Sequence, residues 1–135
     1  MKRYLHILAK VLFSLILILP VIGITGLLGE PTRELYNTDL AYAFIQMLTN
    51  VMYINYMMVV VHLIVLFALW TGREALAAIL VLPITLNVFA FHLVIDGGIF
   101  TGGAMLANVM LLLNLYLLWV NRTAYLPLLN SKRII

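Results

Sequence analysis

The sequence predicts an all-α integral membrane protein, a four-helix bundle with both ends of the chain in the cytoplasm. Hydrophobic residues make up 65% of its 135 positions and charged residues only 10%, whereas soluble domains carry about 25% charged residues. Four long stretches lack charged residues altogether, and most basic residues flank those stretches on one side. This composition excludes a soluble enzyme and a disordered tail, because the excess apolar surface needs a bilayer to cover it.

Each uncharged stretch can hold one helix across the hydrocarbon, which takes about 20 residues. The stretches are Val11–Gly29, Leu40–Gly72, Ala75–Ile95 and Gly97–Asn121. We expect a single transmembrane domain over 1–135, with spans at about 8–28, 51–70, 75–95 and 104–121. The second stretch is too long for one span, and its polar and aromatic first part predicts an interfacial helix over 40–50.

The basic residues orient these spans. Of the eight, only Arg33 falls on the side opposite the chain ends, so the positive-inside rule predicts an N-in/C-in topology. The excess positive charge then serves orientation and lipid headgroups, which makes the bilayer the expected partner and nucleic acid an unexpected one. The absence of cysteine excludes thiol nucleophiles, cysteine-bound zinc and iron–sulfur clusters.

Polar side chains inside spans are costly and are the first candidates for a functional site. His92 and Asp96 are four residues apart near the outer end of the third span, so they share a helix face and could handle a proton together. Three asparagines join them as candidate ligand-binding residues: Asn55, Asn87 and Asn108. At 1.5 Å per residue, Asn55 and Asn108 lie at about the depth of His92. We therefore expect an outward-facing polar pocket, with Thr25, Tyr53 and Tyr56 beside it, for a hydroxylated or quinonoid head group.

The alternative is that these groups only join helices through hydrogen bonds, each worth about 0.6–2 kcal/mol. His62 is a further candidate ligand-binding residue, expected neutral near mid-depth in the second span. Its depth differs from that of His92 by roughly 13 Å, which disfavours haem held between the two. No metal site is predicted, because no two histidines are four residues apart.

The second half of the chain resembles a known family. The runs that carry the resemblance are Leu82-Pro83-Ile84-Thr85-Leu86-Asn87-Val88-Phe89-Ala90-Phe91-His92-Leu93-Val94-Ile95-Asp96, Leu113-Asn114-Leu115-Tyr116-Leu117-Leu118-Trp119, and Arg122 with Tyr125-Leu126-Pro127-Leu128-Leu129. They look like the third and fourth helices of the DoxX family of small four-helix bacterial membrane proteins. Relatives often carry a glutamate in the second helix, and His62 occupies that position when counted back from Arg73.

The resemblance implies a location in the bacterial inner (cytoplasmic) membrane and a link to quinone-coupled oxidoreductases. Our first hypothesis is a membrane subunit of a redox complex that binds a quinone-like or other amphipathic molecule near the outer helix ends. A non-enzymatic assembly or stabilising subunit of a larger membrane complex is the second, and a small transporter the third. The sequence leaves open whether the chain is an enzyme, which ligand it takes and which protein it joins.

Overall fold

The computed structural model describes the backbone of residues 2–129 and the side chains of 3–127. Within these residues the chain is helical and contains no strand. The six α-helices are α1 (Lys2–Gly23), α2 (Asp39–Val51), α3 (Tyr53–Trp70), α4 (Glu74–Ala90), α5 (Ala104–Val120) and α6 (Arg122–Leu129), with a short 3₁₀ turn, η1 (Arg33–Leu35), and a π-helical turn, η2 (Phe91–Ile95). The all-α prediction is confirmed.

Three segments are long and apolar enough to cross a membrane: Arg3–Gly23, Tyr53–Trp70 and Glu74–Ile95. They correspond to the first three expected spans. The fourth expected span is α5, which is apolar but has only 17 residues, at the lower end of the length that a crossing helix needs. The uncharged stretch begins at Gly97, but α5 begins only at Ala104, because a glycine-rich turn comes first. This turn contains Gly97, Gly98, Gly102 and Gly103.

The first span differs from its expected range at both ends. The helix begins at Lys2 because basic residues are good helix formers, even though the apolar stretch starts later. It ends at Gly23 rather than near 28, because Gly26 and Gly29 adopt positive φ angles of 79° and 76° in the turns that follow.

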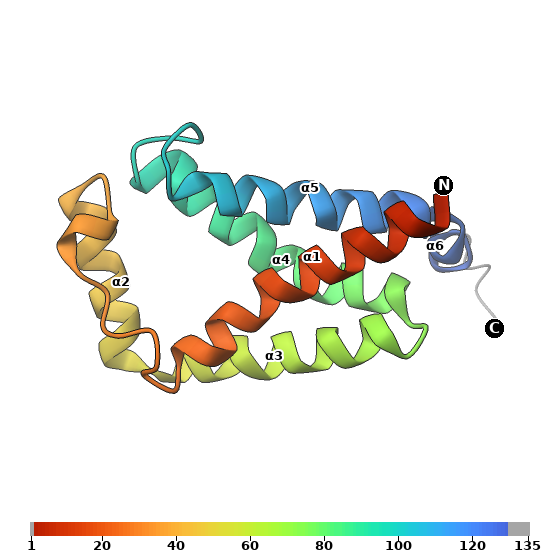
Figure 1. Ribbon diagram of the computed structural model, residues 1–135, viewed down its shortest axis with the longest axis horizontal. Helices are drawn as coiled ribbons and strands as arrows, with labels where there is room; N and C mark the ends of the chain where they lie inside the picture. Colours follow the sequence, from red (N-terminus) through yellow and green to blue (C-terminus); the bar gives the residue numbers. More distant parts are fainter. Residues whose placement is uncertain (1, 130–135) are drawn as a thin grey trace.

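The four long helices pack side by side around a small core. Helix α4 is central, since it packs against both α3 and α5, and α1 lies across α3 and α5 (Figure 1). The core residues are Phe13, Leu17, Val65, Ala68, Leu69, Ala77, Ala78, Val81, Met110 and Leu117. The alanines let the helix backbones approach closely, as is typical of helix contacts in membranes.

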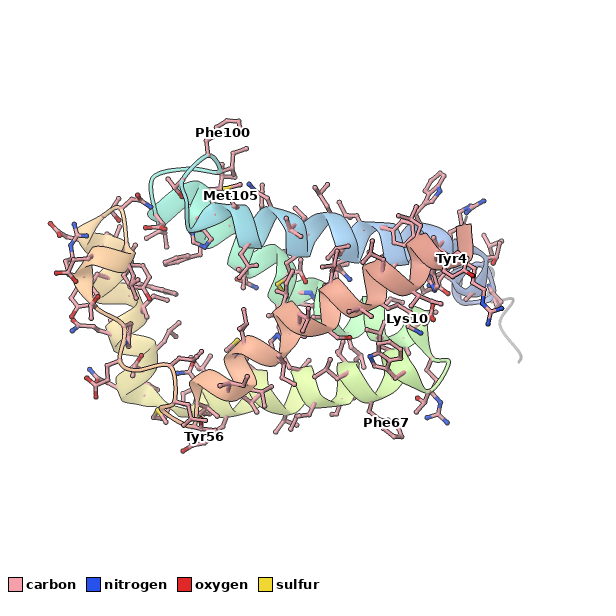
Figure 2. All side chains as sticks on the ribbon, in the orientation of Figure 1. Tyr4, Lys10, Tyr56, Phe67, Phe100 and Met105 are labelled. Atoms are coloured by element: carbon pink, nitrogen blue, oxygen red, sulfur yellow. The ribbon has the colours of Figure 1, made fainter. Side chains whose placement is uncertain are left out.

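Large apolar side chains also cover the outside of these helices. Figure 2 shows Phe67 and Met105 projecting away from the neighbouring helices, and their exposed fractions are 65% and 67%. Only 17–22% of each candidate span window is buried inside the protein. Most of each candidate span therefore lies at the surface of the protein, and large apolar side chains cover much of that surface.

Helix α2 lies apart from the long helices. It crosses the end of these helices where the chain turns from α4 to α5 (Figure 1). It matches the expected helix over 40–50 to within a residue at each end. The Thr38 hydroxyl caps it by accepting from Ala41 N at 3.0 Å. Met52, at φ 56° and ψ −40°, separates it from α3.

Candidate functional site

The end of α4 holds a buried acid. The π-helical turn η2 extends α4, with Asp96 N donating to Phe91 O at 3.0 Å, and such turns often occur at functional sites. Asp96 is fully buried, and His92 Nδ1 lies 2.9 Å from its Oδ2 atom. The structure thus brings together the two residues that the sequence singled out for proton handling.

A segment distant in sequence completes the surroundings of Asp96. Asn37, just before α2, donates to the carboxylate twice, from its backbone N at 2.8 Å and from Nδ2 at 3.3 Å. The hydroxyl of Thr38 also donates to Ile95 O at 2.6 Å. With His92 Nδ1, three nitrogen atoms surround one carboxyl group, and both of its oxygens accept hydrogen bonds from Asn37.

Aromatic rings pack beside the His92–Asp96 pair. Phe91 packs edge-on against His92 at 5.0 Å between ring centroids and against Tyr36 at 6.4 Å. Burial, and secondly the charge of Asp96, raise the pKa of the Tyr36 phenol above its usual value of about 10. Tyr36 therefore stays neutral at physiological pH and adds no charge beside Asp96.

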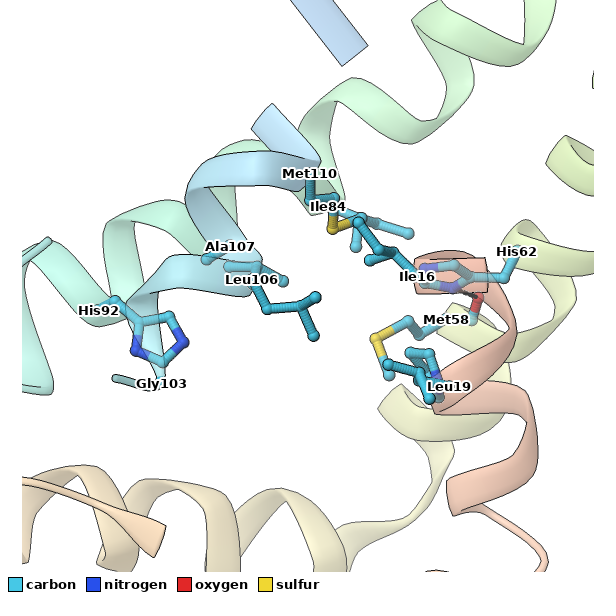
Figure 3. A pocket seen from close by; sticks show the side chains of 12 residues that line it. Ile16, Leu19, Met58, His62, Ile84, His92, Gly103, Leu106, Ala107 and Met110 are labelled. Atoms are coloured by element: carbon cyan, nitrogen blue, oxygen red, sulfur yellow. Dashed lines mark hydrogen bonds between the residues drawn. The ribbon is translucent and has the colours of Figure 1, made fainter. Parts of the chain in front are cut away.

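His92 also faces a cavity of about 150 Å³ among the long helices. The lining residues are Ile16, Leu19, Pro20, Met58, His62, Ile84, Val88, His92, Gly103, Leu106, Ala107 and Met110. Figure 3 shows His92 and His62 at opposite ends of this lining, with apolar side chains between them. The cavity is an apolar space with one imidazole at each end.

Both imidazoles are held through Nδ1. His62, which is 1% exposed, lies with Nδ1 2.7 Å from Met58 O, one helical turn earlier. His92 is held by Asp96 in the same way. Neither Nε2 atom has a hydrogen-bond partner among the described residues, so both are available to a ligand.

Gly103 fits the wall of the cavity closely. A Cβ atom at this position would lie 3.2 Å from His92 Cε1 and 3.6 Å from Asp96 Oδ2. Its φ of −65° is ordinary for any residue, so the need for glycine here comes from space alone. A side chain at the start of α5 would therefore force the His92 ring to shift by a few tenths of an ångström.

The structure does not gather the three asparagines around this cavity. Asn55 Nδ2 donates to Leu48 O at 3.2 Å, Asn87 Nδ2 to Pro83 O at 2.8 Å and Asn108 Nδ2 to Ile99 O at 2.7 Å. None of them lines the cavity, nor do Thr25, Tyr53 and Tyr56. Asn55 and Asn108 instead tie together chain segments that meet at helix breaks, because their amides reach carbonyls beyond their own helices.

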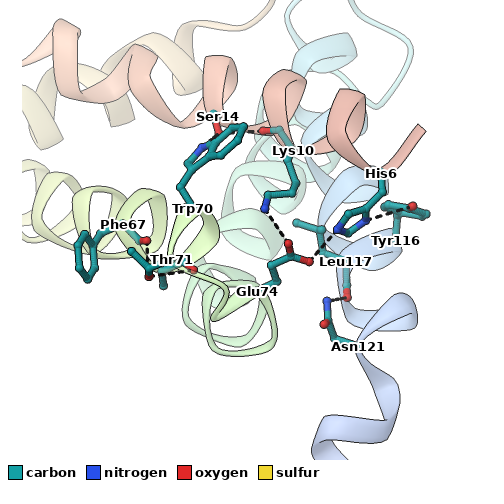
Figure 4. A network of polar contacts seen from close by, with 11 residues as sticks. His6, Lys10, Ser14, Phe67, Trp70, Thr71, Glu74, Tyr116, Leu117 and Asn121 are labelled. Atoms are coloured by element: carbon teal, nitrogen blue, oxygen red, sulfur yellow. Dashed lines mark hydrogen bonds and ion pairs between the residues drawn. The ribbon is translucent and has the colours of Figure 1, made fainter. Parts of the chain in front are cut away.

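A second polar cluster, not singled out from the sequence, lies at the other end of the helices (Figure 4). Glu74 accepts from Lys10 Nζ at 2.7 Å and from His6 Nε2 at 2.8 Å, and Tyr116 OH lies 3.4 Å from His6 Nδ1. Trp70 Nε1 donates to Ser14 Oγ at 3.0 Å. The sequence signal was present, since Glu74 is the one acid expected on the basic side of the membrane. The cluster fastens α1 to the first turn of α4.

No group of three His, Asp or Glu side chains within the described residues could hold a metal ion. Comparison of the chain with protein families, with curated proteins and with solved structures gave no match. Function must therefore be argued from the cavity and its two histidines.

Proposed function

We propose that this chain is an inner-membrane subunit of a quinone-linked redox complex, and that it binds an amphipathic ring in the cavity between His62 and His92. The observation that carries the proposal is the cavity itself, an apolar space of about 150 Å³ with an anchored imidazole at each end. Ligand sites are usually apolar cavities with a few polar groups that orient the ligand. A quinonoid head group, with a flat apolar ring and oxygen atoms at both ends, has matching chemistry.

The outer surface supports a place in the bilayer. α1, α3, α4 and α5 carry exposed leucine, isoleucine, valine and phenylalanine side chains along their length, a surface that water would disfavour. In the proposed arrangement these four helices form a bundle that crosses the membrane. Lys10, Arg73 and Arg122 at one end lie in the cytoplasm, and Asp96 and α2 lie at the outer face.

His92 and Asp96 are proposed to handle the proton of the ligand. The carboxylate fixes the imidazole through Nδ1, which leaves Nε2 as the atom that meets the ligand. Electrons would come from a catalytic partner subunit. The chain itself supplies the binding cavity, the orientation and the proton contact.

Binding of a decyl-substituted dimethoxy-methyl-benzoquinone to the purified protein in mild detergent tests the proposal. Ala107 is 3% exposed and lines the cavity, so Ala107→Val places extra methyl groups in that space, and we expect the affinity to fall at least about tenfold. Ala90→Val, at an exposed position outside the cavity lining, is the matched control and should bind as the native chain does. Equal binding by all three proteins, or no binding by any, would contradict the proposal.

The second candidate is an assembly subunit without a ligand of its own. One observation favours it: the amides of Asn55 and Asn108 donate to carbonyls outside their own helices, as expected of groups that only hold chain segments together. Capture of the tagged chain tests for a stoichiometric partner. If His92→Ala leaves both assembly and the partner's activity intact, the assembly role is favoured over the redox role.

A further inference from the structure

The hydrogen bond of His62 fixes where its proton lies. A backbone carbonyl can only accept, so the 2.7 Å contact between His62 Nδ1 and Met58 O places a hydrogen on Nδ1. A neutral imidazole has one N–H, and an unpaired imidazolium among apolar side chains would be costly. Nε2 of His62 is therefore a bare nitrogen that accepts hydrogen bonds.

His92 is held differently, because its Nδ1 atom faces a carboxylate that already accepts two hydrogen bonds from Asn37. That contact fixes the direction of the ring without fixing whether Nε2 carries a hydrogen. The His62 end of the cavity is therefore the end that presents an acceptor to the ligand, and this acceptor needs a donor.

Size and lining restrict the ligand further. An apolar cavity of roughly 150 Å³ takes a benzene-sized ring. Apart from the two imidazoles, the lining offers only aliphatic side chains, methionines and Gly103. A flat ring with a hydroxyl group directed at His62 would leave that acceptor paired.

We propose that the cavity prefers the reduced ligand, a hydroquinone, over the corresponding quinone. The inference rests on the proposed function and adds to it the form of the ligand. One hydroxyl donates to Nε2 of His62. A carbonyl oxygen of a quinone has lone pairs only, so at this position it would face an acceptor and leave both atoms without a partner.

Three probes that share one ring test this preference. Dissociation constants are measured anaerobically in mild detergent for trimethylhydroquinone, for trimethylbenzoquinone and for the dimethyl ether of trimethylhydroquinone. We expect the hydroquinone to bind at least about tenfold more tightly than the quinone or the ether, neither of which can donate. Equal or tighter binding of the quinone would overturn this inference while leaving a quinone-binding function standing. Failure of all three probes, and of the decyl-substituted quinone, would overturn both.

Substitution of His62 tests the same point from the side of the protein. His62→Phe keeps a flat ring but removes the acceptor, so the hydroquinone should lose most of its advantage while quinone binding is unchanged or tighter. His62→Gln serves where the phenylalanine variant does not fold, because its carboxamide can donate to a quinone and should also reduce the preference. His6→Gln, at the opposite end of the helices, is the control and should retain the full preference. A His62→Phe protein with the native preference would contradict the assignment.

Discussion

Replacing Asp96 by asparagine should disturb the chain far more than its small change in size suggests. The carboxylate accepts three hydrogen bonds, from Asn37 N at Oδ1 and from Asn37 Nδ2 and His92 Nδ1 at Oδ2. An asparagine offers one oxygen and one NH₂ group in their place. Because the backbone N–H of Asn37 cannot become an acceptor, the amide oxygen must take the Oδ1 position.

The NH₂ group of Asp96→Asn then faces two donors. His92 can adapt by moving its hydrogen from Nδ1 to Nε2, but the charge-assisted hydrogen bond is lost and the Asn37 amide must turn. For a fully buried group, loss of one such bond costs about 1–3 kcal/mol of unfolding free energy.

Reversible unfolding in mixed detergent measures the loss of stability, and nitrogen NMR of labelled histidine reports the tautomer of His92. Asp39→Asn is the matched control, since the Asp39 side chain is 94% exposed and pairs only with Arg33 at 2.6 Å. Surface pairs of this kind contribute about 0–1 kcal/mol, so its effect should be small. The reasoning would be refuted by an Asp96→Asn protein as stable as Asp39→Asn, with the His92 hydrogen still on Nδ1.

Three further predictions concern the helix ends. Gly103→Ala should displace the His92 ring by a few tenths of an ångström and weaken ligand binding, whereas Gly102→Ala, where a Cβ meets nothing within 4 Å, should bind normally; equal affinities would contradict the close contact at Gly103. Glu74→Gln should lower the unfolding free energy by about 1 kcal/mol, because Lys10 and His6 lose a partly buried carboxylate, and an unchanged unfolding curve would show that the cluster does not fasten α1. Met52→Gly should raise the unfolding free energy by about 1 kcal/mol by relieving a positive φ angle, and a lower value would mean that the lost side-chain packing outweighs that relief.

Helix positions could be predicted from the sequence because uncharged stretches and helices largely coincide in this chain. The end of α1 could not be predicted as well. Gly23, Gly26 and Gly29 recur every third residue, which on a helix would form a small stripe for close packing. In the structure Gly26 and Gly29 instead turn the chain at positive φ angles. The spacing of glycines alone does not distinguish a packing stripe from a series of turns.

Contacts in the candidate site could be predicted only where both residues lie on one helix. His92 and Asp96 share a face because they are four residues apart, and they contact each other. The grouping of Asn55, Asn87 and Asn108 needed the positions of separate helices and the side-chain rotamers, and nearby carbonyls take up all three amides. Depth along a helix could be counted, but the direction in which each side chain points could not.

The position of His92 depends on contacts from three separate parts of the chain. The π-helical turn sets the backbone, Asn37 orients the carboxylate that holds Nδ1, and Gly103 leaves room for the ring by having no side chain. Asn37 lies two residues before the start of α2, and Gly103 lies immediately before α5. A displacement of the start of α2 or of α5 would therefore alter the direction of His92 Nε2. The cavity residues on α3 would stay unchanged. This explains why a histidine near the end of a helix, where side chains are commonly mobile, can hold a fixed direction toward the cavity.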